Sequence, residues 1–467
     1  MSNVNEMSAK VMLGQQGKYL LELDGYCFRK DRDMASSEIS WRCCKNKCSV
    51  SLRTIGATYV ITHTNGHQHN HEKMSDRTAE RRRLSASAKR KAENDICERP
   101  SKVLRSLMTE NTTETLQKSD ILKIKRNMYN ARRKHLPTLP KTRYEVQEAV
   151  CGMNLRTIRG EEFVVMNDTD SGIIVYTCLT NLKALVAATA LYIDGTFKYC
   201  PKFYYQFLTI HGFFSGHYVP LVFCLLPNKE EATYTLCFNA LSDICACHQL
   251  DFRPPLIVTD FEMGLQNSCS SAWPSAVLKA CRFHLTQAWW RRIQKVGLAT
   301  DYMNDTDVGK WLKLFFGLLF LKPTDVEPCY HEILAKQPEN SKPIESFSKY
   351  IYNTYISRGV KYPPEIWACP TSNLDETTNA CESFHSHLSE NFDSHHPNIF
   401  KFSEFLLDYQ KEVLISLNSC GEEKRTRNSH TRQKQAFVKS QLEKYTSNET
   451  SAFDVVHRLS HYYSHTC

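Results

Sequence analysis

The chain has 467 residues, enough for two or three domains that each bury a core. Its 19 cysteines are an odd number and the N-terminus has no apolar signal segment, so we expect reduced thiols and metal ligands, not a disulfide framework. A formal net charge of +9 favours polyanionic partners. The longest apolar helix candidate, 311–321, is too short to cross a bilayer. Together these features predict a nuclear protein with no membrane partner.

Residues 14–75 form a small segment rich in Cys and His. Alternating residues around Asp24-Gly25 predict a β-hairpin, and short strands are expected at 49–54 and 58–62. Two thiolates and two imidazoles would give tetrahedral zinc coordination, which stabilises a domain of this size. Scattered cysteines beside a His-rich loop are the alternative interpretation.

A Trp41-Arg42-Cys43 element, a downstream cysteine and a closing His-Asn-His make this segment resemble the FLYWCH zinc finger. The resemblance implies these zinc ligands: Cys43, Cys48, His69 and His71. Cys44 is an alternative to Cys43, because the cysteine spacing is short for the family, and His67 is an extra histidine in the second cluster.

FLYWCH modules are similar to other DNA-binding zinc folds, so basic side chains of this segment are candidate phosphate contacts. They are Arg29, Lys30, Arg32, Lys45, Lys47 and Arg53. An ordinary solvated face is the alternative for these charges.

From residue 76 to residue 100 the chain becomes basic and lacks large hydrophobic residues. The clusters 81–83 and 89–91 are typical of a nuclear-localisation or nucleic-acid-binding patch, and a solvated linker is the alternative. We therefore expect a basic linker over 76–100.

Two helical patterns follow within 101–143, and the second, 119–134, has an apolar stripe with basic residues on its opposite face. Those basic residues are Lys123, Arg126, Arg133 and Lys134. A helix-turn-helix-like module could place this face on DNA. An amphipathic helix packed on the next domain, with a hydrated back, explains the same pattern.

Apolar runs at 203–214 and 218–226 predict strands of a sheet that is covered on both faces. Asp194 ends the strand before them, Asp260 follows another strand-like run, and Glu382 lies in a later helical stretch. Acids on two strand ends and a helix can converge on divalent cations, which prefer oxygen ligands. Solvated loop carboxylates are the alternative.

The motifs DGTFK, LPNKEEATY, IVTDFEMGL, CRFHL and TTNACESFHSHL, in this order over 185–391, resemble the transposase domain of Mutator-like elements (MULE). The resemblance implies an α/β, RNase H-like catalytic core with a mixed sheet and flanking helices. It also implies that Asp194, Asp260 and Glu382 are catalytic and hold Mg²⁺ or Mn²⁺. Two such ions can stabilise both the attacking and the leaving oxygen of a phosphoryl displacement.

Cys281 and His284 are similar to a Cys-x-x-His element of related transposase superfamilies, and we expect them to support the site and not to bind metal. His385 shares a helix face with Glu382 and could hydrogen-bond it or the scissile region, and a structural role is the alternative. Two arginines that follow His284 are candidate phosphate contacts: Arg291 and Arg292.

The stretch between Asp260 and Glu382 is too long for a loop and has helical content, so we expect an all-helical insertion at about 285–375. The predicted organisation is a disordered N-terminus (1–13), a zinc finger (14–75), a basic linker (76–100), a helical module (101–143), the MULE domain (144–395) and a helical basic tail (396–467).

These features predict a DNA transposase that acts on double-stranded DNA at transposon ends and target sites, by metal-dependent cleavage and strand transfer. We expect a homo-oligomer, because two DNA ends must be held together, and no small-molecule substrate. The alternatives are a transposon-derived DNA-binding regulator without catalysis and a nuclease without strand transfer.

Overall fold

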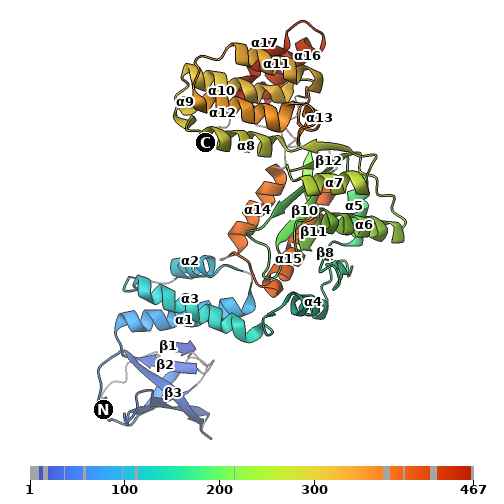
Figure 1. The fold of residues 1–467 in the computed structure, drawn as a ribbon. Helices are drawn as coiled ribbons and strands as arrows, with labels where there is room; N and C mark the ends of the chain where they lie inside the picture. Colours follow the sequence, from blue (N-terminus) through green and yellow to red (C-terminus); the bar gives the residue numbers. More distant parts are fainter. Residues whose placement is uncertain are drawn as a thin grey trace. The chain divides into compact units, whose positions relative to one another are not determined.

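The computed structural model describes residues 10–13, 19–35, 37–55, 59–96, 98–110, 114–214, 216–371, 379–392, 395–420 and 429–463 (Figure 1). The chain divides into two compact units, Met1–Leu139 and Pro140–Cys467. No helix in the described ranges combines the length and apolar character that a membrane span requires. None of the described cysteines forms a disulfide.

The first unit opens with an antiparallel sheet whose strands follow chain order. The strands are β1 (Lys10–Leu13), β2 (Tyr19–Leu23), β3 (Tyr26–Asp33), β4 (Glu38–Cys43), β5 (Ser51–Ile55) and β6 (Val60–Thr64). The predicted hairpin is confirmed: Asp24 and Gly25 have φ of 50° and 82°, which suits a tight turn between twisted strands. Trp41 is buried in the small core, and its Nε1 donates to Thr54 Oγ1 at 2.9 Å.

Residues 76–94 form helix α1 (Asp76–Asn94), where the composition predicted a basic linker. Ser75 caps the helix by accepting from the Thr78 backbone N–H. Alanine and leucine side chains at helical spacing bury α1 against α2 (Pro100–Glu110) and α3 (Lys118–His135). The residues that form this core are Leu84, Ala88, Ala92, Val103, Leu104, Leu107, Ile124 and Met128. Small side chains in 76–94 therefore allow α1 to pack closely on α2 and α3, and their presence does not indicate a linker.

The arginines 81–83 are bound within the first unit. Arg81 forms an ion pair with the buried carboxylate of Asp120, whose other oxygen accepts from Arg77 Nε at 2.7 Å. Arg82 donates to Cys27 Sγ at 3.5 Å, and Arg83 pairs with Glu22. This basic cluster fastens α1 to α3 and to the sheet.

The second unit has a mixed sheet in the order β13-β12-β9-β10-β11-β8-β7. Its strands are β7 (Val164–Asn167), β8 (Ile174–Tyr176), β9 (Ala190–Thr196), β10 (Gln206–Phe214), β11 (His217–Leu226), β12 (Leu256–Thr259) and β13 (Val277–Ala280). Strand β9 pairs antiparallel with β10 and parallel with β12, so it lies at the junction of the two parts of the sheet.

Helices cover both faces of this sheet, as the long apolar strands predicted (Figure 1). They are α4 (Arg143–Gly152), α5 (Leu179–Ala187), α6 (Glu231–Cys247), α7 (Met263–Ala272), α14 (Asn379–Asn391) and α15 (Ile399–Ser419). Side chains of α6 and α7 join the core that contains Ile193 and Leu208. On α15, the Phe402 ring lies 4.9 Å from that of Phe207, centroid to centroid.

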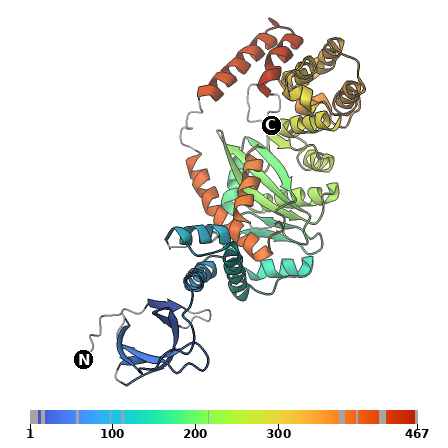
Figure 2. The same ribbon diagram turned by 90° about the vertical axis from the view of Figure 1, so that its left-hand side faces the viewer.

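The remaining elements are helical and pack together as one group, which we call the helical lobe. It contains α8 (Arg282–Lys295), α9 (Ala299–Met303), α10 (Asp307–Gly317), η1 (Leu318–Phe320), α11 (Pro323–Ala335), α12 (Lys342–Ile351), η2 (Tyr352–Ile356), α13 (Pro364–Trp367), α16 (Ser429–Thr446) and α17 (Ala452–Tyr463). Figure 2 shows the red C-terminal helices against the yellow and orange ones.

The segment 396–467, predicted as a helical basic tail, contributes helices to two different cores of the second unit. Its first helix, α15, packs on the sheet, whereas α16 and α17 enter the core of the helical lobe. Val438, Val455 and Leu459 are buried there. The apolar residues of these helices were too interspersed with charge for the sequence to assign them to that core.

Candidate metal centre and acidic site

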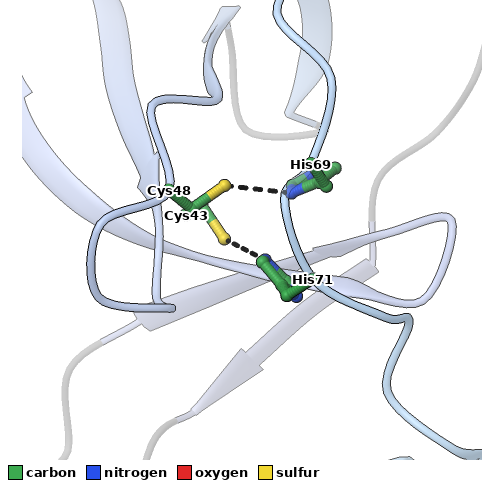
Figure 3. Close-up of side chains that lie close together, drawn as sticks. All are labelled: Cys43, Cys48, His69 and His71. Carbon is green, nitrogen blue, oxygen red and sulfur yellow. Dashed lines mark hydrogen bonds between the residues drawn. The ribbon is translucent and has the colours of Figure 1, made fainter.

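The four predicted zinc ligands meet at one point of the first unit (Figure 3). Cys43 Sγ lies 3.2 Å from His71 Nε2, and Cys48 Sγ lies 3.4 Å from His69 Nδ1. All four donor atoms lie within 4.8 Å of one another. Zinc bonds of about 2.3 Å to sulphur and 2.0 Å to nitrogen place tetrahedral S and N ligands roughly 3.5 Å apart, so the donor set fits structural Zn²⁺.

The structure decides between the adjacent cysteines and histidines that the sequence left open. Cys43 is buried and belongs to the cluster, whereas Cys44 is exposed and lies outside it. His67 Nδ1 lies 2.8 Å from Ser49 Oγ and contributes no ligand to the cluster. The cluster therefore supports structural zinc at the positions that the resemblance implied.

The first two predicted catalytic acids stand side by side in the second unit. Asp194 lies in β9 and is 4 % exposed, and Asp260 directly follows β12. The parallel register aligns Thr259 with Ile193, so the next step along both strands brings Asp260 opposite Asp194. Neighbouring strands are about 4.8 Å apart, and the carboxyl ends of parallel strands meet at one edge of a sheet.

Burial and a neighbouring acid make Asp260 costly to ionise. Burial, followed by the negative charge of Glu262, raises the pKa of Asp260 to about 6. The Glu262 backbone N–H donates to Asp260 Oδ1 at 3.1 Å and favours the charged form, but it does not cancel the burial. A nearby cation would remove this repulsion.

His385 reaches the same place from α14. Its Nδ1 lies 3.5 Å from Asp194 Oδ2, and its Nε2 lies 3.4 Å from Thr209 Oγ1. Burial, followed by the charge of His284, lowers the pKa of His385 to about 4, so the ring is neutral at physiological pH. The helical spacing predicted Glu382 as a partner for this histidine, and the structure adds Asp194 and Thr209.

Glu382 belongs to α14, but its side chain lies outside the described residues. The helix itself lies against β9, because Cys381 Sγ is 3.8 Å from the carbonyl oxygen of Tyr192. Glu382 as the third acid therefore stays a prediction.

Cys281 and His284 lie beside the acidic strands. Cys281 is buried, and its backbone N–H donates to Thr259 oxygen at 2.7 Å. Burial, followed by the charge of Arg291, lowers the pKa of His284 to about 4. Among the described Cys, His, Asp and Glu side chains, the zinc-finger cluster is the only group of three or more with metal-binding spacing, and it includes neither residue.

Most of the predicted DNA contacts are exposed. These are Arg29, Lys45, Lys47, Lys123, Arg126, Arg133, Lys134 and Arg291. Arg53 is half-buried and lies 3.8 Å from Glu38. Arg292 donates to Ser346 Oγ at 2.6 Å and lies over the Tyr350 ring, so it holds the helical lobe together.

Arg132 is a buried structural residue that the sequence pattern does not distinguish from its basic neighbours. Its guanidinium is buried and donates to the carbonyl oxygens of Ala92, Asp95 and Glu98, which closes the end of α1. Its neighbours Arg133 and Lys134 are exposed. Arg132 is adjacent in sequence to the exposed basic residues but lies on the buried side of the helix. The charge of the side chain alone does not show this difference.

Comparison with known families agrees with both resemblances. The model of the MULE transposase domain matches residues 190–288, which include Asp194 and Asp260. The model of the FLYWCH zinc finger domain matches residues 11–71, which include all four zinc ligands. No curated protein matches the chain. The chain therefore contains a MULE transposase domain preceded by a FLYWCH zinc finger.

Proposed function

We propose that this transposase-related DNA-binding protein is an active DDE-type DNA transposase, which binds transposon ends and then cuts and joins DNA strands. The observation that carries the proposal is the parallel pairing of β9 with β12, which sets Asp194 beside Asp260. The order of the mixed sheet supports an RNase H-like core. The helices between Asp260 and Glu382 support a helical insertion.

The two aspartates offer the oxygen ligands that hard divalent cations prefer, from neighbouring parallel strands, and Asp260 resists ionisation in the absence of a cation. When bound, Mg²⁺ or Mn²⁺ would stabilise the attacking and leaving oxygens of the phosphodiester. Glu382 would complete the ligand set from α14. A nuclear location and a homo-oligomer that holds two DNA ends belong to the same proposal.

The side chains around Asp194 fix its orientation. Neutral His385 can donate from Nδ1 to Asp194 Oδ2 while its Nε2 faces the Thr209 hydroxyl, 3.4 Å away. That hydroxyl also lies 3.3 Å from the Asp194 carbonyl oxygen. A carboxylate held in this way keeps its position without rearranging when the substrate binds.

The test is cleavage of the flanking genomic DNA by the purified full chain with Mg²⁺. We expect Asp194→Asn and Asp260→Asn each to lower the cleavage rate by about 100-fold or more, the scale of losing one electrostatic group at a transition state. DNA affinity should stay unchanged, because the finger and helical module are intact. Asp251→Asn is the matched control, since its carboxylate is exposed and pairs with Arg253.

Retained cutting by Asp194→Asn would refute the assignment. A wild-type protein that binds the DNA tightly and never cuts it would identify the DNA-binding regulator instead. Cut ends that never become joined to target DNA would identify a nuclease.

A further inference from the structure

We call Asp194 in β9 and Asp260 after β12 the acidic site. The connection between β9 and β10, which begins just after Asp194, presents aromatic rings to solvent. Phe197, Phe203 and Tyr205 are 43 %, 44 % and 50 % exposed. The Phe197 and Tyr205 rings meet edge to face, 5.2 Å apart. Large aromatic side chains dominate cores and binding interfaces, so a group of exposed rings indicates a partner. We call residues 197–205 the aromatic loop.

The aromatic loop is anchored by its other residues. Tyr199 and Tyr204 are buried, and the Tyr205 backbone N–H donates to Leu226 oxygen at 2.9 Å. The backbone N–H of His396 donates to Lys198 oxygen at 3.2 Å. The exposed rings therefore stand on a fixed backbone, which reduces the entropy lost when a partner binds.

Phe203 has a φ of +73°, a left-handed conformation that a bulky side chain rarely adopts. Such a backbone persists where surrounding structure fixes it, and these sites concentrate at ligand clamps and active sites. At Phe203 the conformation displays a ring to solvent instead of filling a core. Burial in the core therefore does not explain it.

Lysines lie within the aromatic loop and between it and the acids. Lys198 and Lys202 are exposed within the aromatic loop. Lys229 Nζ lies 6.0 Å from the Phe197 ring centroid and 4.0 Å from Glu262 Oε1. Glu262 in turn donates its backbone N–H to Asp260, so Lys229 lies between the aromatic loop and the acidic site.

We propose that the aromatic loop binds unpaired nucleotides of a DNA end next to the acidic site. The bases stack on Phe197, Phe203 and Tyr205, and Lys198, Lys202 and Lys229 face the phosphates. Stacking on aromatic rings within a basic surface is the general way in which proteins hold single strands without reading their sequence. The inference rests on the proposed function, because the cut strand supplies the unpaired nucleotides.

The test compares two DNAs that share one duplex stem, one blunt and one with an unpaired thymidine overhang that carries 2-aminopurine. The full chain is titrated with each DNA without added Mg²⁺. We expect wild type to prefer the overhang by about 10-fold and to quench its fluorescence, as base stacking does. Phe203→Ala combined with Tyr205→Ala should remove both effects and leave affinity for the blunt duplex unchanged.

Matched variants distinguish the loss of base stacking from the loss of any exposed apolar side chain. Tyr205→Phe keeps the ring and should keep the preference, and Ile415→Ala, which trims an exposed apolar side chain of α15, should change nothing. Lys202→Ala should weaken overhang binding and lower its salt slope by about 1.

Equal wild-type affinity for both DNAs would overturn the inference. So would a double variant that loses dimerisation in sedimentation and keeps its overhang preference, because the rings would then contact a second copy of the chain. Ring-dependent overhang binding without any cleavage in Mg²⁺ would refute the proposed function alone. Cleavage without ring-dependent binding would refute only this inference.

Discussion

At the scale of single residues, neighbours of the zinc ligands set the ring orientations. His71 Nδ1 lies 2.9 Å from the Glu72 carbonyl oxygen, which leaves Nε2 facing Cys43 Sγ. The Tyr26 ring stacks on His69 with centroids 3.5 Å apart. The sequence supplied the ligand types, but adjacent residues of a strand point to opposite sides, and only the fold shows which cysteine faces the histidines.

Replacing one cysteine at a time tests this choice. Cys43→Ser should abolish stoichiometric zinc binding, because it removes a ligand of the cluster, whereas Cys44→Ser should retain it. Structural zinc contributes about 10–16 kcal/mol of apparent binding free energy in zinc-finger peptides at neutral pH. Zinc content by mass spectrometry and amide exchange of β3 and β4 measure the outcome, and the reverse pattern would assign Cys44 as the ligand.

Asp120 gives the first unit a defined acid sensitivity. Hydrogen bonding from Arg77, helped by the Gln117 backbone and Arg81, lowers the pKa of Asp120 to about 2. Its contribution to stability is fully present above the unfolded pKa of about 4 and is lost as the pH falls through about 2. Amide exchange in α3 should therefore be slower in wild type than in Asp120→Asn at neutral pH, and this difference should shrink below pH 4. A difference that is constant with pH would exclude the ion pairs as its cause.

At the scale of elements, the hairpin at Asp24-Gly25 and the buried strands β10 and β11 could be predicted, because turn residues and apolar runs are local signals. Helix α1 was missed, since its buried residues are mostly alanines within a basic segment. The placement of α16 and α17 depends on contacts with helices more than 100 positions earlier in the chain, such as the hydrogen bond between Tyr445 and Asp325. No local pattern carries such information.

Helices α10 and α17 approach each other so closely at Gly317 that a larger residue does not fit there. A Cβ at Gly317 would lie 2.6 Å from the Val456 carbonyl oxygen, so the helices must separate to admit it. We expect Gly317→Ala to destabilise the helical lobe by about 1–3 kcal/mol, although alanine favours helices. Thermal unfolding of the full chain measures the effect. Gly152→Ala at the end of α4 is the control, since nothing lies within 4 Å of its added Cβ, and equal effects of the two variants would disprove close packing as the cause.

At the scale of the whole molecule, the acidic site combines segments that lie far apart in sequence. The sequence motifs predicted that Asp194 and Asp260 belong to one site, and the sheet register puts the two positions on neighbouring parallel strands. The contact of His385 with Asp194 required the fold, because it joins α14 to β9 across nearly 200 positions. The zinc finger and the MULE domain on one chain unite DNA binding with the proposed cutting.

The junction of α16 and α17 with the earlier helices has a consequence for biosynthesis. A ribosome releases the chain from its N-terminus, yet α17, which covers part of the apolar surface of α10 and α11, follows them by more than 100 residues. The newborn chain therefore exposes that surface until α17 has emerged. A message cut short before α16 would leave the surface uncovered, and we expect such a product to aggregate more readily than the whole chain.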